Sequence, residues 1–329
     1  MLFHQHSLES MTSMDFDTAN MNSNFNKILY LIYAKSPLQK KKLAKYLSKQ
    51  DERFFVDAEE FATNYLNYLI DENISLEYVV DAYLKMCTDM LKSQIKFMKT
   101  GCYPVELSKE AFETVYSNET EMKSYMIGLA LSQFLWESHF KIYNTFESYL
   151  QKSKEHIHSY LEIGPGHGLF LNKAINYLGV NTSITVVDVS PISTNITKSI
   201  IKYFHPDRDN IIFYNMDMLE IDLAYQYDFI MMGEVIEHVN SPEILLNKLN
   251  NLLVPNGRAF ISTCVNCPAI DHVYHFHTVD EIRNMFSKCG FAIEEEQILP
   301  VEDLCMQVIK EKKITINYCA ILKRGALNE

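Results

Sequence analysis

A glycine-rich turn between an apolar strand and a helical segment constrains the fold of this chain more than any other feature. The strand expected at residues 158–163 ends in Gly164-Pro-Gly-His-Gly168. An apolar helical face follows directly, at Phe170, Leu171, Ala174, Ile175 and Leu178. Glycines at alternate positions let the backbone turn tightly and keep side chains away from the carboxyl end of the strand. The turn therefore predicts a nucleotide-like ligand, but it does not by itself indicate a reaction.

After residue 157 the sequence alternates strands and helices, which is typical of a parallel sheet with helices on both faces. One helix has Ser241 as its cap and Pro242 at its first position, and it ends at Pro255-Asn-Gly257. A second helix is expected at 280–288. The expected strands are 158–163, 183–188, 211–214, 227–232, 257–263, 291–298 and 314–322.

The first half of the chain carries helical signals instead. Ser75 is placed to cap a helix that ends at Gly101-Cys-Tyr-Pro104. The same spacing of apolar residues recurs over residues 59–70 and 108–116, and a long aromatic-rich segment covers 119–150. These aromatic side chains either form a core or line a pocket.

These signals divide the chain into three parts. Residues 1–26 read as a disordered leader, because they are rich in Met, Asn and Ser and lack the apolar core of a signal peptide. Residues 27–152 are expected to form a helical domain that serves as a lid, a substrate pocket or a dimer interface. Residues 153–329 are expected to form the sheet domain that binds the ligand.

Composition narrows the partners and the compartment. A formal net charge of -12 and a pI near 5.4 argue against broad binding to nucleic acid or to anionic membranes. The seven cysteines are scattered, which favours a reduced, cytoplasmic setting. No segment approaches the roughly 20 apolar residues of a membrane span. We therefore expect a cytoplasmic protein with no membrane association.

Ligands of doubly wound sheets bind beyond the carboxyl ends of the strands, so the residues at those ends are the candidates. Glu162 closes the first strand. Asp188 closes the second, where a carboxylate can accept both hydroxyls of a ribose. After the third strand come Asp217 and its flanking methionines, which suit an adenine ring. The fourth strand ends in Gly233-Glu-Val-Ile-Glu-His-Val239.

Together these four strand ends resemble the class I S-adenosylmethionine-dependent methyltransferase family. The resemblance covers roughly residues 157–322, because Glu-x-Gly-x-Gly-x-Gly and the later acids come in the order and spacing of the family. Pro-Asn-Gly before the fifth strand and Gly-Phe before the sixth also look like that family. It implies a doubly wound, Rossmann-like α/β sheet of seven strands with the last one antiparallel, and S-adenosylmethionine as cofactor.

The resemblance assigns the first strand end to the amino-acid part of the cofactor. Gly164, Gly166 and Gly168 would pass along its methionine moiety, and Glu162 would organise its ammonium group through water. Leu169 occupies the place where the fingerprint of a nicotinamide dehydrogenase has a small residue, which argues against that rival reading.

The other strand ends are assigned to the rest of the cofactor. Asp188 would hold the ribose, Asp217 with Met218 the adenine, and Glu234 with Val235 would border the sulfonium. Two alternatives stay open at this point. Asp188 could merely cap the following helix, and Asp217 could be an ordinary loop acid.

The fourth strand end also suggests a metal. Glu234, Glu237 and His238 share one face if the chain turns helically there. Their Glu-x-x-Glu-His segment is similar to that of small-RNA 2′-O-methyltransferases and of ubiquinone-pathway O-methyltransferases. There a divalent ion (Mg²⁺, Mn²⁺, Fe²⁺ or Zn²⁺) would gather the acceptor hydroxyls and lower their pKa. The predicted ligands here are Glu234, Glu237, His238 and His275.

Two other interpretations of this region remain. A histidine could act as a base without metal, and the candidates for deprotonation or metal support are His238, His272, His275 and His277. The histidines could also be purely structural. Cys264-x-x-Cys267 with the nearby histidines could instead bind zinc, although the chain has only one such cysteine pair.

The sequence therefore predicts a methyltransferase of the EC 2.1.1 class that acts on a small-molecule acceptor, most simply at oxygen, and that could form a homodimer. One alternative is a 2′-O-methyltransferase for RNA ends, which salt-dependent retention on RNA would reveal. The other is a non-catalytic cofactor-binding or assembly protein, which would bind the cofactor without turnover.

Overall fold

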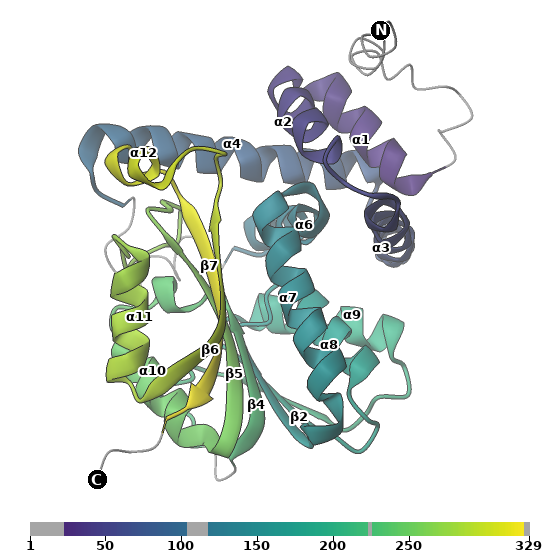
Figure 1. The fold of residues 1–329 in the computed structure, drawn as a ribbon. Coiled ribbons are helices and arrows are strands. Elements are labelled where there is room, and N and C mark those ends of the chain that lie inside the picture. The colour runs from purple at the N-terminus through teal and green to yellow at the C-terminus, as the bar shows by residue number, and fades with distance from the viewer. Residues whose placement is uncertain (1–22, 104–117, 223–225, 326–329) are drawn as a thin grey trace, which may run out of the picture. The chain divides into compact units, whose positions relative to one another are not determined.

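The computed structural model describes residues 23–103, 118–222 and 226–325, and Figure 1 shows their helices and strands. The chain divides into two compact units, Met1–Val80 and Asp81–Glu329. The boundary lies within helix α4 (Leu76–Thr100), well before the predicted boundary at residues 152 and 153. The part that the helices play as a lid or dimer interface stays a prediction.

The first unit contains three complete helices, α1 (Asn24–Lys35), α2 (Pro37–Leu47) and α3 (Glu52–Asp71). The predicted leader is too long at its end, because α1 already begins at Asn24, while residues 1–22 lie outside the described part. The carboxylate of Glu59 in α3 accepts the N–H groups of Asn24 and Phe25, each at 2.9 Å. These N–H groups have no partner inside α1, so α3 caps α1.

The second unit continues α4 and adds α6 (Glu119–Leu135) and α7 (Glu137–Ser153). The predicted cap of α4 is confirmed, because Ser75 Oγ accepts the N–H of Tyr78 at 3.2 Å. The helical pattern at 108–116 lies outside the described residues. The long segment predicted at 119–150 is two helices: Trp136 is extended, with φ -122°, and its indole donates to the Tyr83 hydroxyl at 3.0 Å.

The seven-stranded sheet has the order β3-β2-β1-β4-β5-β7-β6, and β7 runs antiparallel to both of its neighbours. This confirms the predicted methyltransferase-like α/β sheet. The strands are β1 (Ser159–Ile163), β2 (Ser183–Asp188), β3 (Ile211–Asn215), β4 (Tyr227–Gly233), β5 (Leu253–Val265), β6 (Phe291–Pro300) and β7 (Ile316–Arg324).

One predicted boundary is wrong. Pro255-Asn-Gly257 was expected to end a helix, but the helix α10 (Pro242–Leu252) stops earlier and these residues already belong to β5. In the pairing with β4, Tyr227 lies opposite Leu253 and Phe229 opposite Arg258. The proline and glycine are therefore accommodated in an irregularity at the start of the strand, where such residues are tolerated.

Helices cover both faces of the sheet (Figure 1). On one face lie α7, α8 (Leu169–Tyr177) and α9 (Pro191–Phe204), and on the other lie α10 and α11 (Val279–Lys288). Phe146 of α7 packs on Phe260 of β5 with 5.4 Å between ring centroids. The neighbouring β5 residue, Ile261, joins the core that α10 and α11 form on the opposite face, as the alternation of a strand requires.

Three short helical segments complete the described chain: η3 (Lys154–His156), η4 (Ile236–His238) and α12 (Met306–Glu311). Among the helices of residues 23–103, 118–222 and 226–325, none is long and apolar enough to cross a membrane.

Candidate active site at the carboxyl edge of the sheet

The glycine turn after β1 adopts a backbone that side chains would not permit. Gly164, Gly166 and Gly168 have φ angles of 64°, 54° and 72°. A Cβ atom on Gly164 would lie 2.7 Å from Cγ2 of Val235, which follows β4. The turn therefore needs glycine at residue 164 for two reasons, a left-handed backbone and close packing against the segment after β4. These two strand ends form one continuous surface.

Glu162 lies just beneath this turn and is 1% exposed. Its Oε2 accepts the hydroxyl of Tyr160 at 2.5 Å, and the N–H of Leu171 in the first turn of α8 also bonds to its carboxylate. Burial raises the pKa of Glu162 to about 8, and these two hydrogen bonds oppose the shift. The predicted contact with an ammonium group stays a prediction, whereas the observed bonds hold α8 against β1.

His167 connects the turn to α6. Its Nδ1 accepts the N–H of Leu169 at 3.2 Å, so Nε2 must carry the hydrogen in the neutral ring. Nε2 lies 3.3 Å from the side-chain amide of Gln133 in α6. Burial lowers the pKa of His167 to about 3, which keeps the ring neutral. Met126 of the same helix lies close to Gly166, 3.5 Å from where a Cβ would stand, so α6 borders the turn.

Asp188 lies buried at the end of β2. Its Oδ1 accepts the N–H of Ser190 at 2.7 Å and its Oδ2 accepts the hydroxyl of Ser193 at 2.5 Å. Burial raises the pKa of Asp188 to about 6, although these hydrogen bonds favour the charged form. The carboxylate thus orders the start of α9, which was the alternative for this residue. The N–H of Gly166 also bonds to this carboxylate, so three of its roughly four acceptor positions are used and the ribose contact stays a prediction.

The two residues assigned to adenine lie differently from each other. Asp217 is exposed and its Oδ1 accepts the N–H of Leu219 at 2.8 Å. Met218 is buried and belongs to the same core cluster as Val187 and Ile221, and the adenine contact of both residues stays a prediction. Met216, only partly buried, packs at the edge of that core.

The segment after β4 turns sharply into the 3₁₀ helix η4. Glu234 has a φ of 51°, rare for a residue with a side chain, and its N–H donates to the Ser262 carbonyl of β5 at 3.0 Å. Glu237 is 1% exposed and its Oε2 accepts the hydroxyl of Thr263 at 2.8 Å. Burial raises the pKa of Glu234, and burial together with the Glu234 carboxylate raises that of Glu237.

His238 follows directly and has 17% of its side chain exposed. Its Nδ1 lies 2.9 Å from the Asp271 carbonyl and 3.6 Å from Oδ2 of the same residue. A carbonyl oxygen only accepts, so Nδ1 carries the hydrogen and Nε2 carries the lone pair. Nε2 lies 4.0 Å from Oε1 of Glu237. This arrangement fixes the tautomer and the orientation of the neutral imidazole.

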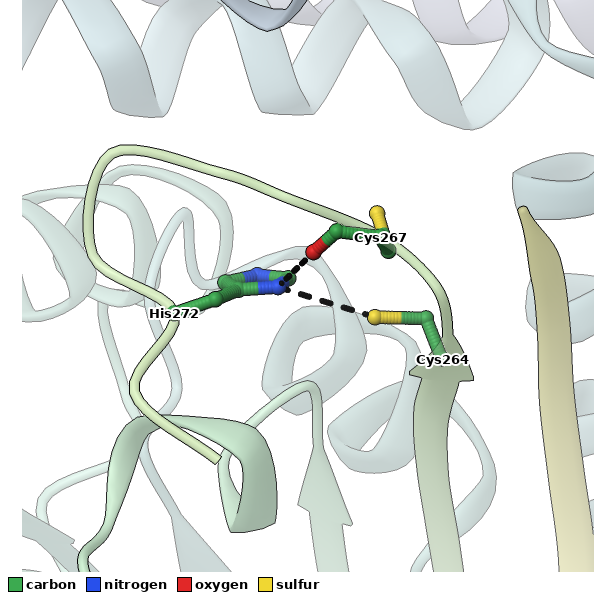
Figure 2. A group of neighbouring side chains, drawn as sticks. All are labelled: Cys264, Cys267 and His272. Carbon is green, nitrogen blue, oxygen red and sulfur yellow. Dashed lines mark hydrogen bonds between the residues drawn. The ribbon is translucent and has the colours of Figure 1, made fainter. Parts of the chain in front are cut away.

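His272 comes from the loop between β5 and α11. Its Nδ1 lies 2.6 Å from the Cys267 carbonyl and 3.7 Å from Sγ of Cys264, as Figure 2 shows. The rings of His272 and His238 meet edge to face, with centroids 4.7 Å apart. Burial, and secondarily the nearby His238, lowers the pKa of His272 to about 4.

The other two candidate histidines lie farther along the same loop. His275 Nε2 lies 2.8 Å from the Asn266 side-chain oxygen, and its ring stacks on Tyr103 with centroids 4.5 Å apart. Burial lowers the pKa of His275 to about 4. His277 is exposed, and its backbone N–H donates to Glu281 at 2.8 Å. His275 is therefore bonded within the loop, whereas His277 is bonded to α11 through its backbone.

Three groups of side chains each bring donor atoms within 4.8 Å of one another: Glu237, His238 and His272; Glu234, Glu237 and Cys264; and Cys264, Cys267 and His272. Among the described residues, none of these groups includes His275. The histidine that joins the glutamates is therefore His272, and the assignment of His275 as the fourth ligand does not fit this geometry.

Comparison with known protein families identifies the domain to which this sheet belongs. Residues 135–296 match the model of a methyltransferase domain, from the end of α6 to β6. The chain contains a methyltransferase domain of the class I family. The match includes the glycine turn, Asp188 and the whole segment after β4, so the family read from the strand ends is confirmed.

Individual relatives resemble this methyltransferase over part of their length. The ubiquinone biosynthesis O-methyltransferase of Rattus norvegicus is 32% identical over 132 residues, 39% of this chain and 36% of that protein. Probable polyketide synthase 38 of Dictyostelium discoideum is 29% identical over 177 residues, 48% of this chain and 5% of that protein. The chain thus spans well under two thirds of these relatives.

Among solved structures, the N-methyltransferase NodS from Bradyrhizobium japonicum, determined with S-adenosyl-L-homocysteine, matches with a TM-score of 0.49 and 14% identity. The match covers 67% of this chain and 100% of that one.

Sequence reasoning missed the groups that surround the methyltransferase site from elsewhere in the chain. Asp271 orients His238, and the hydroxyl of Tyr103 accepts the N–H of Cys267 at 2.9 Å. Tyr125 of α6 is half-buried near Asp271 and Glu234. Desolvation raises the pKa of its hydroxyl, and the two carboxylates raise it further. No motif marks these residues. The only sequence signal was the excess of aromatic residues in the helical half.

Proposed function

We propose that this protein transfers the methyl group of S-adenosylmethionine to a hydroxyl oxygen of a small-molecule acceptor. The observation that carries the proposal is the meeting of the glycine turn and the Glu234–His238 segment at one sheet edge, where Val235 leaves no room for a side chain on Gly164. Donor-binding and acceptor-activating groups would thus share one surface.

The residues after β1 and β2 suit the methyl donor, S-adenosylmethionine. S-adenosylmethionine supplies a methyl group on a positively charged sulfur, which an aligned nucleophile can take. Gly164, Gly166 and Gly168 have a left-handed backbone and no Cβ atoms, so the cofactor can approach the backbone of the turn after β1. The buried Asp188 carboxylate, already bonded to Ser190, Ser193 and Gly166, would offer its remaining acceptor position to a ribose hydroxyl. The chain's work on this side is therefore to bind and orient.

The acceptor side would remove a proton. His238 Nε2 carries the lone pair because Nδ1 donates to the Asp271 carbonyl, and the partly exposed ring can reach an acceptor. A histidine held in one tautomer by its second nitrogen is a suitable general base near neutral pH. Asp271 would act through His238, by holding it in this orientation.

Oxygen as the methylated atom is supported by two independent considerations. The ubiquinone biosynthesis O-methyltransferases of rat and human are 32% and 34% identical over the aligned segments. A hydroxyl also needs a base at neutral pH, whereas a neutral amine does not, and this site contains an oriented histidine.

A divalent ion is a second route to the same deprotonation. Oε1 of Glu237 is buried, and within the described ranges no hydrogen-bond partner reaches it. Glu237, His238 and His272 could hold an ion near the acceptor, with Glu234 beside them. If so, excess chelator abolishes activity and Mg²⁺, Mn²⁺ or Fe²⁺ restores it. Full activity in chelator assigns the deprotonation to His238 alone.

Transfer of an isotopically labelled methyl group into an extract of small molecules tests the proposal. We expect label in products that carry a methyl ether, identified by mass spectrometry, and no label with an Asp188→Ala variant. Label only in amines would contradict oxygen as the target. Binding of the cofactor without transfer to any pool would contradict an enzymatic role.

A further inference from the structure

A cluster of soft donor atoms lies beside the proposed base, where β5 passes into its following loop. Cys264 is the last but one residue of the strand, Cys267 follows three residues later, and His272 returns to them from farther along the loop (Figure 2). All three side chains are buried and both cysteines are free thiols. One donor atom of each lies within 4.8 Å of the others. We propose that these three residues bind a zinc ion, with Glu237 as its fourth ligand.

The distances match those of a tetrahedral zinc site. With a Zn–S bond of about 2.3 Å and a Zn–N bond of about 2.1 Å, a tetrahedral angle places the sulfur and nitrogen about 3.6 Å apart. In this structure, Cys264 Sγ and His272 Nδ1 are 3.7 Å apart. The spacing Cys-x-x-Cys is also one that lets two thiolates bind a single ion.

The hydrogen on His272 marks the position of the ion. Nδ1 donates to the Cys267 carbonyl at 2.6 Å and faces the sulfur of Cys264, so its hydrogen lies between the ring and the two cysteines. An ion there would replace this hydrogen, which moves to Nε2 as the tautomer changes. Binding would also release the protons of both thiols.

The fourth ligand is supported by a separate observation. Glu237 lies in a donor group with Cys264 and in another with His272. Its Oε1 is buried without a hydrogen-bond partner among the described residues, a costly state for a carboxylate that a cation would relieve. Thr263 holds the other oxygen at 2.8 Å, so the free oxygen has a fixed direction.

Zinc at this position would tie the loop to the segment after β4. The N–H groups of Val273 and Tyr274 already donate to the Glu237 carbonyl at 2.9 and 2.8 Å. Asp271, which orients His238, lies next to His272 in the same loop. The ion would therefore stabilise the positioning of the base. This site does not depend on methyl transfer. Zinc would take Glu237 and His272 as ligands. The divalent-ion site of Glu237, His238 and His272 could therefore not be occupied at the same time.

Cobalt substitution tests the site on the full-length protein. After removal of metal, we expect about one equivalent of Co²⁺ to bind, with the near-ultraviolet charge-transfer band of cobalt–thiolate bonds, and Zn²⁺ to displace it. Cys264→Ser, Cys267→Ser and His272→Asn should each lose the band. Cys289→Ser, at a buried cysteine after α11, should keep it.

Three results would overturn the proposal: no uptake of Co²⁺ or Zn²⁺ by folded protein, binding without a thiolate band, or a band that survives Cys264→Ser. Circular dichroism shows whether each variant is folded. X-ray absorption of the zinc-loaded wild-type protein needs no variant, and we expect sulfur neighbours at about 2.3 Å. A first shell of only oxygen and nitrogen would equally contradict the site.

Discussion

The two sides of the candidate site are built by different means. The side after β1 and β2 consists mainly of backbone: a left-handed glycine turn, helix starts, and one buried carboxylate that accepts the N–H of Ser190 and the hydroxyl of Ser193. The side after β4 and β5 consists of titratable side chains from two loops, Glu237 and His238 from one and His272 from the other.

This difference indicates a division of labour. A backbone surface is rigid and carries little charge of its own, so it suits a donor that arrives already activated. A buried group of carboxylates, imidazoles and thiols has unmet bonding capacity, as Oε1 of Glu237 illustrates, so it suits proton transfer or metal binding. Substitutions on the two sides should therefore affect different quantities.

The largest effect is expected from His238→Asn. Loss of the base should lower kcat by about 10²- to 10⁴-fold while the affinity for S-adenosylmethionine stays nearly unchanged. Steady-state kinetics with the acceptor found by label transfer, together with calorimetry, measures both quantities. His158→Asn, at an exposed histidine just before β1, is the matched control. Equal losses of kcat in the two variants would remove His238 from the mechanism.

Asp188→Ala should change the affinity for S-adenosylmethionine rather than kcat. It removes the charged acceptor at the end of β2, so the Kd for S-adenosylmethionine should rise by more than about tenfold. Asp217→Ala is the comparison variant, because it also removes a carboxylate bonded to a backbone N–H, but an exposed one. A larger rise of Kd in the Asp188 variant would show that binding depends on more than the loss of a local turn. A normal Kd for the Asp188 variant would mean that this residue only orders the start of α9.

Gly164→Ala should weaken both the fold and the donor side. A left-handed residue with a side chain costs about 1–3 kcal/mol, and the new Cβ would meet Val235 at 2.7 Å. We expect a lower Tm and lost cofactor binding. Gly179→Ala, where the nearest atom lies 3.9 Å from the added Cβ, should leave both unchanged. Adding Val235→Ala should recover part of the Tm, and no recovery would disprove the proposed contact.

The smallest effect is a pH dependence that Glu162 gives to stability. Its pKa is raised from 4.5 to about 8, so the unfolded chain loses this proton first as pH rises. The contribution to stability is thus fully present below about pH 4.5 and is lost as pH rises toward 8. Glu162→Gln should flatten this dependence in urea unfolding curves. The exposed Glu155→Gln serves as control, and identical curves for Glu162→Gln and wild type would contradict the shift.

The sequence predicted the backbone side better than the side-chain side, for a physical reason. Strand periodicity and glycine spacing are local, so β1, β2 and the turn at 164–168 could be placed from the residues alone. The carbonyl that orients His238 belongs to Asp271, thirty-three positions away in the chain. Only the pairing of β4 with β5 brings the two together, and no spacing rule encodes it.

The errors have the same origin. His275 and His272 could not be told apart by residue type, because the loop path decides which of them faces Glu237. Met218 and Asp217 both follow β3, and residue type alone did not show that Met218 is buried in the core while Asp217 is exposed. The break at Trp136 in the long aromatic segment coincides with the indole bond to Tyr83 of α4, a contact that local sequence does not show.

Binding of the cofactor tests the central claim most directly. In isothermal titration calorimetry of the full-length protein, we predict saturable binding of both S-adenosylmethionine and S-adenosylhomocysteine, with the affinity of each reduced more than about tenfold in Asp188→Ala and unchanged in His238→Asn. The absence of heat, and of any shift in Tm, with both molecules would contradict the assignment of this sheet edge as a methyl-donor site.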